Sequence, residues 1–64
     1  MTYMIDTEMM GPDATDEERN MMVALLTERG YDVAAGSGQN DEDYIPDGVW
    51  DECLWLIGFD GADA

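Results

Sequence analysis

Apolar and polar residues alternate along the first segment of the chain, residues 2–9. On one side of an extended backbone lie Tyr3, Ile5, Thr7 and Met9, and on the other lie Met4, Asp6 and Glu8. A period of two is typical of a strand with one buried face. The pattern therefore predicts a strand over residues 2–9, which is interrupted by Gly11 and Pro12.

The next segment has the pattern of a helix with a well-defined first residue. Thr15 and Glu18 have the spacing of a capping box, in which each side chain accepts a hydrogen bond from the other residue's backbone amide. This motif predicts a helix that starts at Asp16, with Arg29 in its last turn and Gly30 at its end. Its apolar side chains share one face, which we expect to pack: Met21, Met22, Leu25 and Leu26.

Shorter elements are predicted in the second half of the chain. Residues 31–35 form a second strand, and residues 36–40 are a flexible turn. Residues 41–45 would return as a third strand and complete a hairpin, although the charge of this stretch is unfavourable for strand pairing. A second helix opens at Pro46 and Asp47 and reaches to about Phe59, and the residues from about 60 onward form a frayed tail.

The second helix carries a wide apolar face that is able to cover a small sheet. That face contains Val49, Trp50, Cys53, Leu54, Leu56 and Ile57. Trp55 projects from the other side, near Phe59 and between Asp51 and Glu52, so we expect an exposed aromatic within an acidic surface. The predicted fold is α+β, with two helices packed on a small antiparallel sheet of two or three short strands, in one domain over residues 1–64.

Composition adds a strong charge to this picture. The chain has sixteen Asp and Glu residues but only two basic residues, so its formal net charge is −14, and it contains no histidine. Its 45% hydrophobic content is too high for a disordered acidic tail. A single cysteine, Cys53, excludes an internal disulfide and fits a reducing compartment. With no apolar run of membrane-spanning length and no signal-peptide pattern, we expect a cytoplasmic protein without a membrane partner.

A catalytic function is not expected from these residues. Histidine and lysine are both absent, and Cys53 has Asp51 and Glu52 as neighbours, whereas a reactive thiolate needs a nearby cation. Paired carboxylates can act as acid and base, but a glycosidase-like site needs a cleft for which so short a chain has little room. We therefore predict no catalytic residues and no cofactor.

A calcium site is the main metal-binding possibility. Asp43, Asp47, Gly48 and Asp51 match positions 1, 5, 6 and 9 of an EF-hand loop. The match fails at position 3, which is Ile45, and at position 12, where Leu54 replaces the bidentate glutamate. No specific metal site is predicted.

The acidic charge matches that of a short piece of nucleic acid. Duplex DNA carries one charge per roughly 1.7 Å, so fourteen charges correspond to about 24 Å of duplex, and a compact chain of this length is about 28 Å across. A nucleic-acid-binding partner would meet these carboxylates with its own Lys and Arg residues. The residues predicted to contact such a partner are Glu28, Asp32, Asp41, Glu42, Asp43, Asp47, Asp51, Glu52 and Trp55.

The chain resembles the small phage-encoded anti-CRISPR proteins, several of which act as DNA mimics. The resemblance lies in its small size, its extreme acidity, its lone cysteine and a capped helix between strands. The resemblance covers size and charge and includes no diagnostic motif, so no residue role is carried over. It is closest to inhibitors of type I systems, with type I-C the first choice. It implies a stoichiometric inhibitor that occupies the basic DNA-binding channel of a Cascade complex, inside a bacterial host cell, without binding nucleic acid itself.

Other functions fit the same charge. Inhibition of a different DNA-binding protein is one, and an antitoxin-like complex with a basic toxin is another. A third is an acidic structural or adaptor protein whose charge serves solubility in a salt-tolerant organism. A mimic is expected to concentrate its carboxylates on one face, whereas a salt-adapted protein is expected to spread them.

Overall fold

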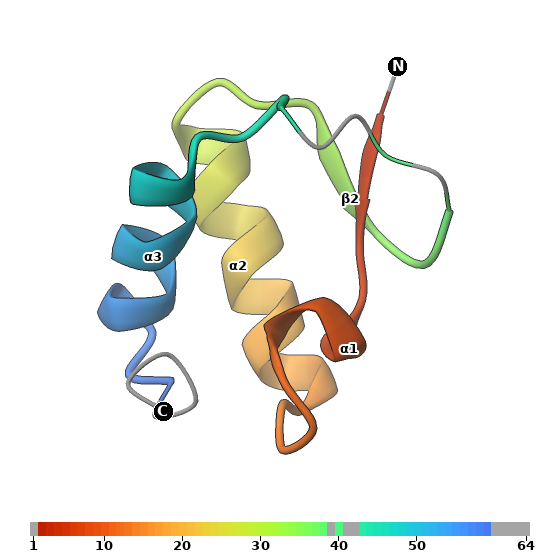
Figure 1. Ribbon diagram of the computed structural model, residues 1–64, viewed down its shortest axis with the longest axis vertical. Coiled ribbons are helices and arrows are strands. Elements are labelled where there is room, and N and C mark those ends of the chain that lie inside the picture. Colours follow the sequence, from red (N-terminus) through yellow and green to blue (C-terminus); the bar gives the residue numbers. More distant parts are fainter. Residues whose placement is uncertain (1, 39, 41–42, 60–64) are drawn as a thin grey trace.

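The computed structural model describes residues 2–38, 40 and 43–59. In these segments the chain forms, in order, β1 (Tyr3–Ile5), α1 (Thr7–Met10), α2 (Asp16–Glu28), β2 (Val33–Ala35) and α3 (Asp47–Leu56). Helix α2 lies in the middle, with α3 on one side and the two strands on the other (Figure 1). The predicted α+β class is confirmed, but the described segments contain three helices where two were predicted. The molecule measures 29 × 20 × 18 Å along its principal axes.

The two strands pair in parallel, so the predicted antiparallel sheet is wrong. Tyr3 lies opposite Val33 and Ile5 opposite Ala35. The Tyr3 N–H donates to the Asp32 carbonyl, and the Gly36 N–H donates to the Ile5 carbonyl, both at 2.9 Å. Parallel strands need a long connection, usually a helix, because the chain must return to the end at which the first strand began. Helix α2 provides that return.

The side chain of Asn40 lies at the outer edge of β1. The Met4 N–H donates to Asn40 Oδ1 at 2.7 Å, and Asn40 Nδ2 donates back to the Met4 carbonyl at 2.8 Å. The Asn40 amide thus forms the two hydrogen bonds that a neighbouring strand would form. The predicted third strand over residues 41–45 is wrong where it is described, because residues 43–45 form a turn and a bend; residues 41 and 42 lie outside the described residues.

The strand predicted over residues 2–9 is wrong beyond Ile5. The Asp6 carboxylate accepts a hydrogen bond from the Met9 N–H at 3.1 Å and so caps the short helix α1. The chain leaves α1 at Gly11, whose φ of 149° is unfavourable for residues with a side chain. A Cβ at this position would also lie 3.2 Å from the ring of Phe59. Local capping by Asp6 therefore overrides the period-two pattern.

Helix α2 begins where the sequence predicts. Both hydrogen bonds of the capping box are present, with Thr15 N–H to Glu18 Oε1 at 2.9 Å and Glu18 N–H to Thr15 Oγ1 at 3.1 Å. The helix ends at Glu28, with Arg29 as its C-terminal cap and Gly30 at φ 97°. Met22 and Leu26, four residues apart, form its buried stripe. Met21 is 39% exposed, so the prediction that it packs with them is wrong.

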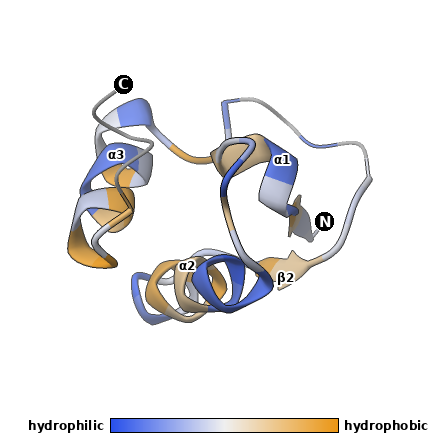
Figure 2. Ribbon diagram, turned by 90° about the horizontal axis from the view of Figure 1, so that it is seen from below, coloured by the Kyte–Doolittle hydropathy of each residue, from blue (hydrophilic) through white to orange (hydrophobic). Residues whose placement is uncertain are grey.

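Helix α3 begins at Asp47, as predicted, but ends at Leu56, three residues before Phe59. Phe59 is only 5% exposed and packs near Gly11, so the prediction that it accompanies Trp55 on the surface is wrong. Leu56 is 49% exposed and does not join the apolar face assigned to it. Seen from below, α3 and α1 lie over the same side of α2 (Figure 2). The core between the elements consists of Ile5, Met10, Met22, Leu26, Ile45, Cys53, Leu54 and Phe59.

Candidate partner-binding surface

The predicted contact residues occupy two regions of the structure. Glu28, Asp47, Asp51, Glu52 and Trp55 belong to the C-terminal end of α2 and to α3, whereas Asp32 and Asp43 lie beside β2 and in the turn before α3. Asp41 and Glu42 lie outside the described residues. All the others are exposed.

One face of α3 carries two carboxylates and a tryptophan in succession. Asp47, Asp51 and Trp55 follow each other at steps of four residues, so each lies about one turn beyond the last on the same side of the helix. The Trp55 side chain is 73% exposed, which confirms the sequence prediction for this residue. We call Asp47, Asp51 and Trp55 the α3 stripe. It places a large apolar side chain directly beside free carboxylates.

An ion pair joins α3 to the end of α2. Arg29 Nη2 lies 2.7 Å from Glu52 Oε1. Glu52 raises the pKa of Arg29 above its ordinary value, first through this hydrogen bond and then through the attraction of opposite charges. Glu52 is therefore already paired within the protein, and its charge is less available to a partner than that of Asp51.

Three tyrosines hold the second region together. The Asp32 N–H donates to the Tyr44 hydroxyl at 2.7 Å. The ring of Tyr44 stacks on Tyr3 with centroids 6.0 Å apart and meets Tyr31 edge-on at 5.6 Å. The Asp32 carboxylate also accepts from Thr2 Oγ1 at 3.3 Å. Sequence reasoning missed this cluster, because nothing in the spacing of the three tyrosines indicates that they meet.

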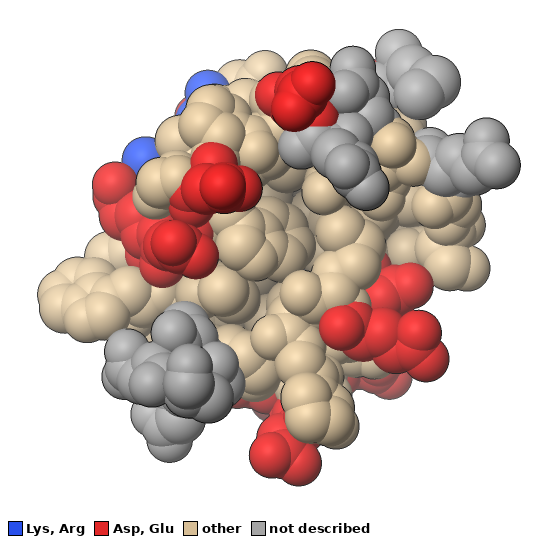
Figure 3. Space-filling model, in the orientation of Figure 1, with Lys and Arg blue, Asp and Glu red and all other residues tan. Residues whose placement is uncertain are grey.

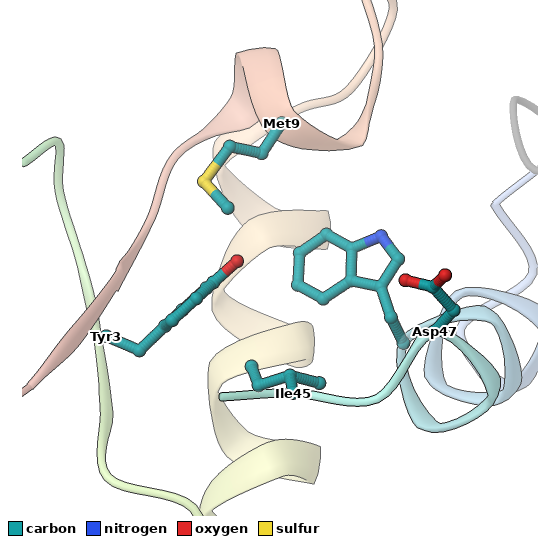
Figure 4. A pocket seen from close by; sticks show the side chains of 5 residues that line it. Tyr3, Met9, Ile45 and Asp47 are labelled. Carbon is teal, nitrogen blue, oxygen red and sulfur yellow. The ribbon is translucent and has the colours of Figure 1, made fainter. Parts of the chain in front are cut away.

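A pocket of about 200 Å³ opens between β1, α1 and the start of α3. Tyr3 points into it from β1, Met9 lies above and Ile45 below, and Asp47 lies on the α3 side (Figure 4). Trp50 of α3 completes the described lining. Among the described residues that line this pocket, Asp47 is the one that was predicted to contact a partner. The pocket was not predicted, since it is built from elements far apart in the sequence.

Other carboxylates lie away from these regions. Asp6, Glu8, Asp16, Glu17 and Glu18 belong to α1, its cap and the first turn of α2. On the face shown in Figure 3, acidic side chains form several separate groups with uncharged surface between them. In the described part of the chain no charged side chain is buried. The acidic surface is therefore extensive, but it is not one continuous patch.

The chemistry available to this surface is binding through charge and apolar contact. Across the described residues, no group of three or more Asp, Glu, Cys or His side chains is arranged to hold a metal ion. The EF-hand positions Asp43, Asp47 and Asp51 thus do not converge. Cys53 is fully buried, in agreement with its place on the predicted apolar face of the second helix. No helix in the described segments has both the length and the apolar content needed to cross a bilayer.

Comparison of the chain with protein-family models, with curated proteins and with solved structures found no match.

Proposed function

We propose that this protein is a stoichiometric inhibitor that binds the basic nucleic-acid channel of another protein and excludes the nucleic acid. The target class that we would test first is a type I CRISPR Cascade complex. Inhibition would occur by occupancy of the channel, without any bond being made or broken.

The observation that carries the proposal is the density of exposed charge. Of the sixteen carboxylates, Asp41, Glu42, Asp60 and Asp63 lie outside the described residues, which leaves twelve against two arginines, a net charge of −10. Along the 29 Å axis this is about one charge per 3 Å. A single DNA strand carries one charge per roughly 3.4 Å and a duplex one per roughly 1.7 Å. A basic channel would therefore meet a charge density within the range of its normal ligand.

The α3 stripe supports the same proposal in a different way. Exposed charge pairs are individually weak and are screened by salt, so they favour fast association more than tight binding. A large aromatic side chain that becomes buried at an interface contributes affinity that salt does not screen. Trp55, with Asp51 one turn away, combines both kinds of contact.

The test is a competition gel shift, in which purified type I-C Cascade is offered labelled target duplex with increasing amounts of this protein at low and at moderate salt. We expect loss of the shifted band, relieved by excess duplex or by salt. An unchanged band at a large molar excess of the protein would overturn the assignment to this target.

Two matched double variants test which end of the molecule makes contact. Glu28→Gln with Asp51→Asn removes two charges near α3, and Asp13→Asn with Glu17→Gln removes two exposed charges near the start of α2. Both pairs change the net charge equally and leave the capping box and the ion pairs intact. We expect the first variant to need about fivefold more protein for half inhibition at low salt, and the second to inhibit as well as the unmodified protein. Equal loss in both would contradict a contact localised at α3.

One observation favours a second candidate function. The carboxylates lie at both ends of α2 and in several groups on the face shown in Figure 3, a distribution expected of a protein whose charge serves solubility at high salt. An acidic structural or adaptor protein of this kind would unfold at low salt and would not retain Cascade or any other nucleic-acid-binding protein. Thermal melting from 10 mM to 2 M KCl distinguishes the two functions.

A further inference from the structure

The pocket between β1, α1 and α3 has the composition of a site for organic cations. Two aromatic rings line it, those of Tyr3 and Trp50. The face of an aromatic ring carries negative potential and attracts ammonium and guanidinium groups, and tryptophan does so most strongly. Met9, from α1, and Asp47, from α3, line it as well, and neither arginine is among the described lining residues.

The size of the pocket restricts what it can hold. A volume of about 200 Å³ is below the 300–1,000 Å³ that is usual for drug-sized ligands. It is large enough for the head group of a single side chain or of a small quaternary amine. Its opening at the surface leaves room for the rest of a longer molecule to remain in solvent.

The rings are held in place before any ligand arrives. Tyr44 does not line the pocket, but it stacks on Tyr3 and is itself fixed by the hydrogen bond from the Asp32 N–H. Trp50 is half-buried in α3, whose first residue is Asp47. Preorganised groups lose little entropy on binding, so that even weak ring contacts contribute to affinity.

We propose that this pocket binds an organic cation, a guanidinium or alkylammonium head group, over the rings of Tyr3 and Trp50 with the Asp47 carboxylate as counter-ion. In the assembled complex the occupant is an arginine or lysine side chain of the partner. This last step rests on the proposed function, whereas binding of a free cation does not. A simple packing gap, by contrast, would take a neutral molecule of the same shape equally well.

The test uses Trp50 fluorescence in a Trp55→Phe background, so that a single indole reports. The protein is titrated with choline, with methylguanidinium, with 3,3-dimethylbutan-1-ol as the neutral isostere of choline, and with sodium chloride at matched ionic strength. We expect a saturable response to both organic cations, a much weaker response to the alcohol, and only a gradual screening effect with sodium. A response to choline that sodium reproduces, or that the alcohol matches, would overturn the proposal.

Two charge variants in that background assign the counter-ion. Asp47→Asn keeps the shape of the side chain and is expected to weaken choline binding about tenfold. Glu17→Gln, in the first turn of α2 and outside the described pocket lining, is the charge-matched control and is expected to bind choline with unchanged affinity. Equal weakening in both variants would show a general effect of net charge and would contradict a site at Asp47.

Amide chemical shifts of the unmodified protein provide a readout that no substitution affects. Choline is expected to shift the resonances of Tyr3, Met9 and Trp50 together, with one dissociation constant. Shifts spread evenly over the acidic surface would contradict the pocket. If the protein fails in the Cascade competition but binds choline saturably, the proposed function is rejected and the cation pocket is supported. If it competes with the duplex but does not bind choline, the cation pocket is rejected and the proposed function is supported.

Discussion

Helices α2 and α3 use their apolar residues differently. In α2 a narrow stripe of Met22 and Leu26 is fully buried, and the start of the helix is fixed by the capping box. In α3, Cys53 and Leu54 are buried, but the next two residues, Trp55 and Leu56, are 73% and 49% exposed. The N-cap residue of α3, Pro46, makes no side-chain capping hydrogen bond.

This difference indicates that the apolar residues of α2 serve the core, whereas α3 also has apolar side chains that the core does not bury. The buried side chains of α2 are covered by α1, β2 and α3, and its exposed positions are mostly polar or charged, with Met21 and Ala24 as the apolar exceptions. Helix α3 exposes two large apolar side chains in succession, and Trp55 lies one turn from the Asp51 carboxylate. In a chain with so high a net charge, exposed aromatic surface beside free acids is where a cationic partner gains most.

The largest effect is expected from truncating the buried stripe of α2. Leu26→Ala removes a fully buried side chain and should lower the free energy of unfolding by about 2–5 kcal/mol, enough to unfold much of so small a domain. Leu56→Ala in α3 is the matched control, and a loss below about 1 kcal/mol is expected because half of that side chain is in water. Urea unfolding followed by circular dichroism measures both. A similar loss of unfolding free energy in both variants would contradict the conclusion that Leu56 contributes little to the core.

A smaller effect is expected from removing the cap of α2. Thr15→Ala deletes the hydroxyl that accepts the Glu18 N–H and should cost roughly 1 kcal/mol. Thr27→Ala makes the same chemical change at an exposed position near the other end of the helix, where no cap is lost. Thermal melts of the two variants should therefore differ. If both variants melt like the unmodified protein, the capping box does not contribute to stability, and α2 resembles α3, which begins without a side-chain capping hydrogen bond.

The smallest effect is expected from the ion pair between the two helices. Arg29→Gln removes the contact with Glu52 and should lower the melting temperature slightly at low salt, with the difference disappearing near 1 M NaCl. Arg19→Gln is the charge-matched control, because the ion pair that Arg19 forms among the described residues is with Asp16, at 3.6 Å within α2 itself. A lower melting temperature for Arg19→Gln than for Arg29→Gln would contradict a role for the pair in joining α3 to α2.

The features that could be predicted from the sequence involve residues close together in the chain. The start of α2 follows from Thr15 and Glu18, three residues apart, and its end follows from a glycine that accepts a positive φ. The exposure of Trp55 follows from its position opposite the apolar face of a short helix. Helical hydrogen bonds and caps connect near neighbours, so a local pattern is enough to specify them.

The features that could not be predicted from the sequence involve residues far apart in the chain. Asn40 meets Met4 across 36 positions, and Arg29 meets Glu52 across 23. Contacts between distant residues also determine the parallel direction of β2, the burial of Phe59 near Gly11 and the pocket between Tyr3 and Trp50. The sequence indicates that the carboxylates lie in water, because burying unpaired charge is too costly. Which of them share a face depends on how the helices pack, and that is fixed by side-chain fit across the core rather than by any local pattern.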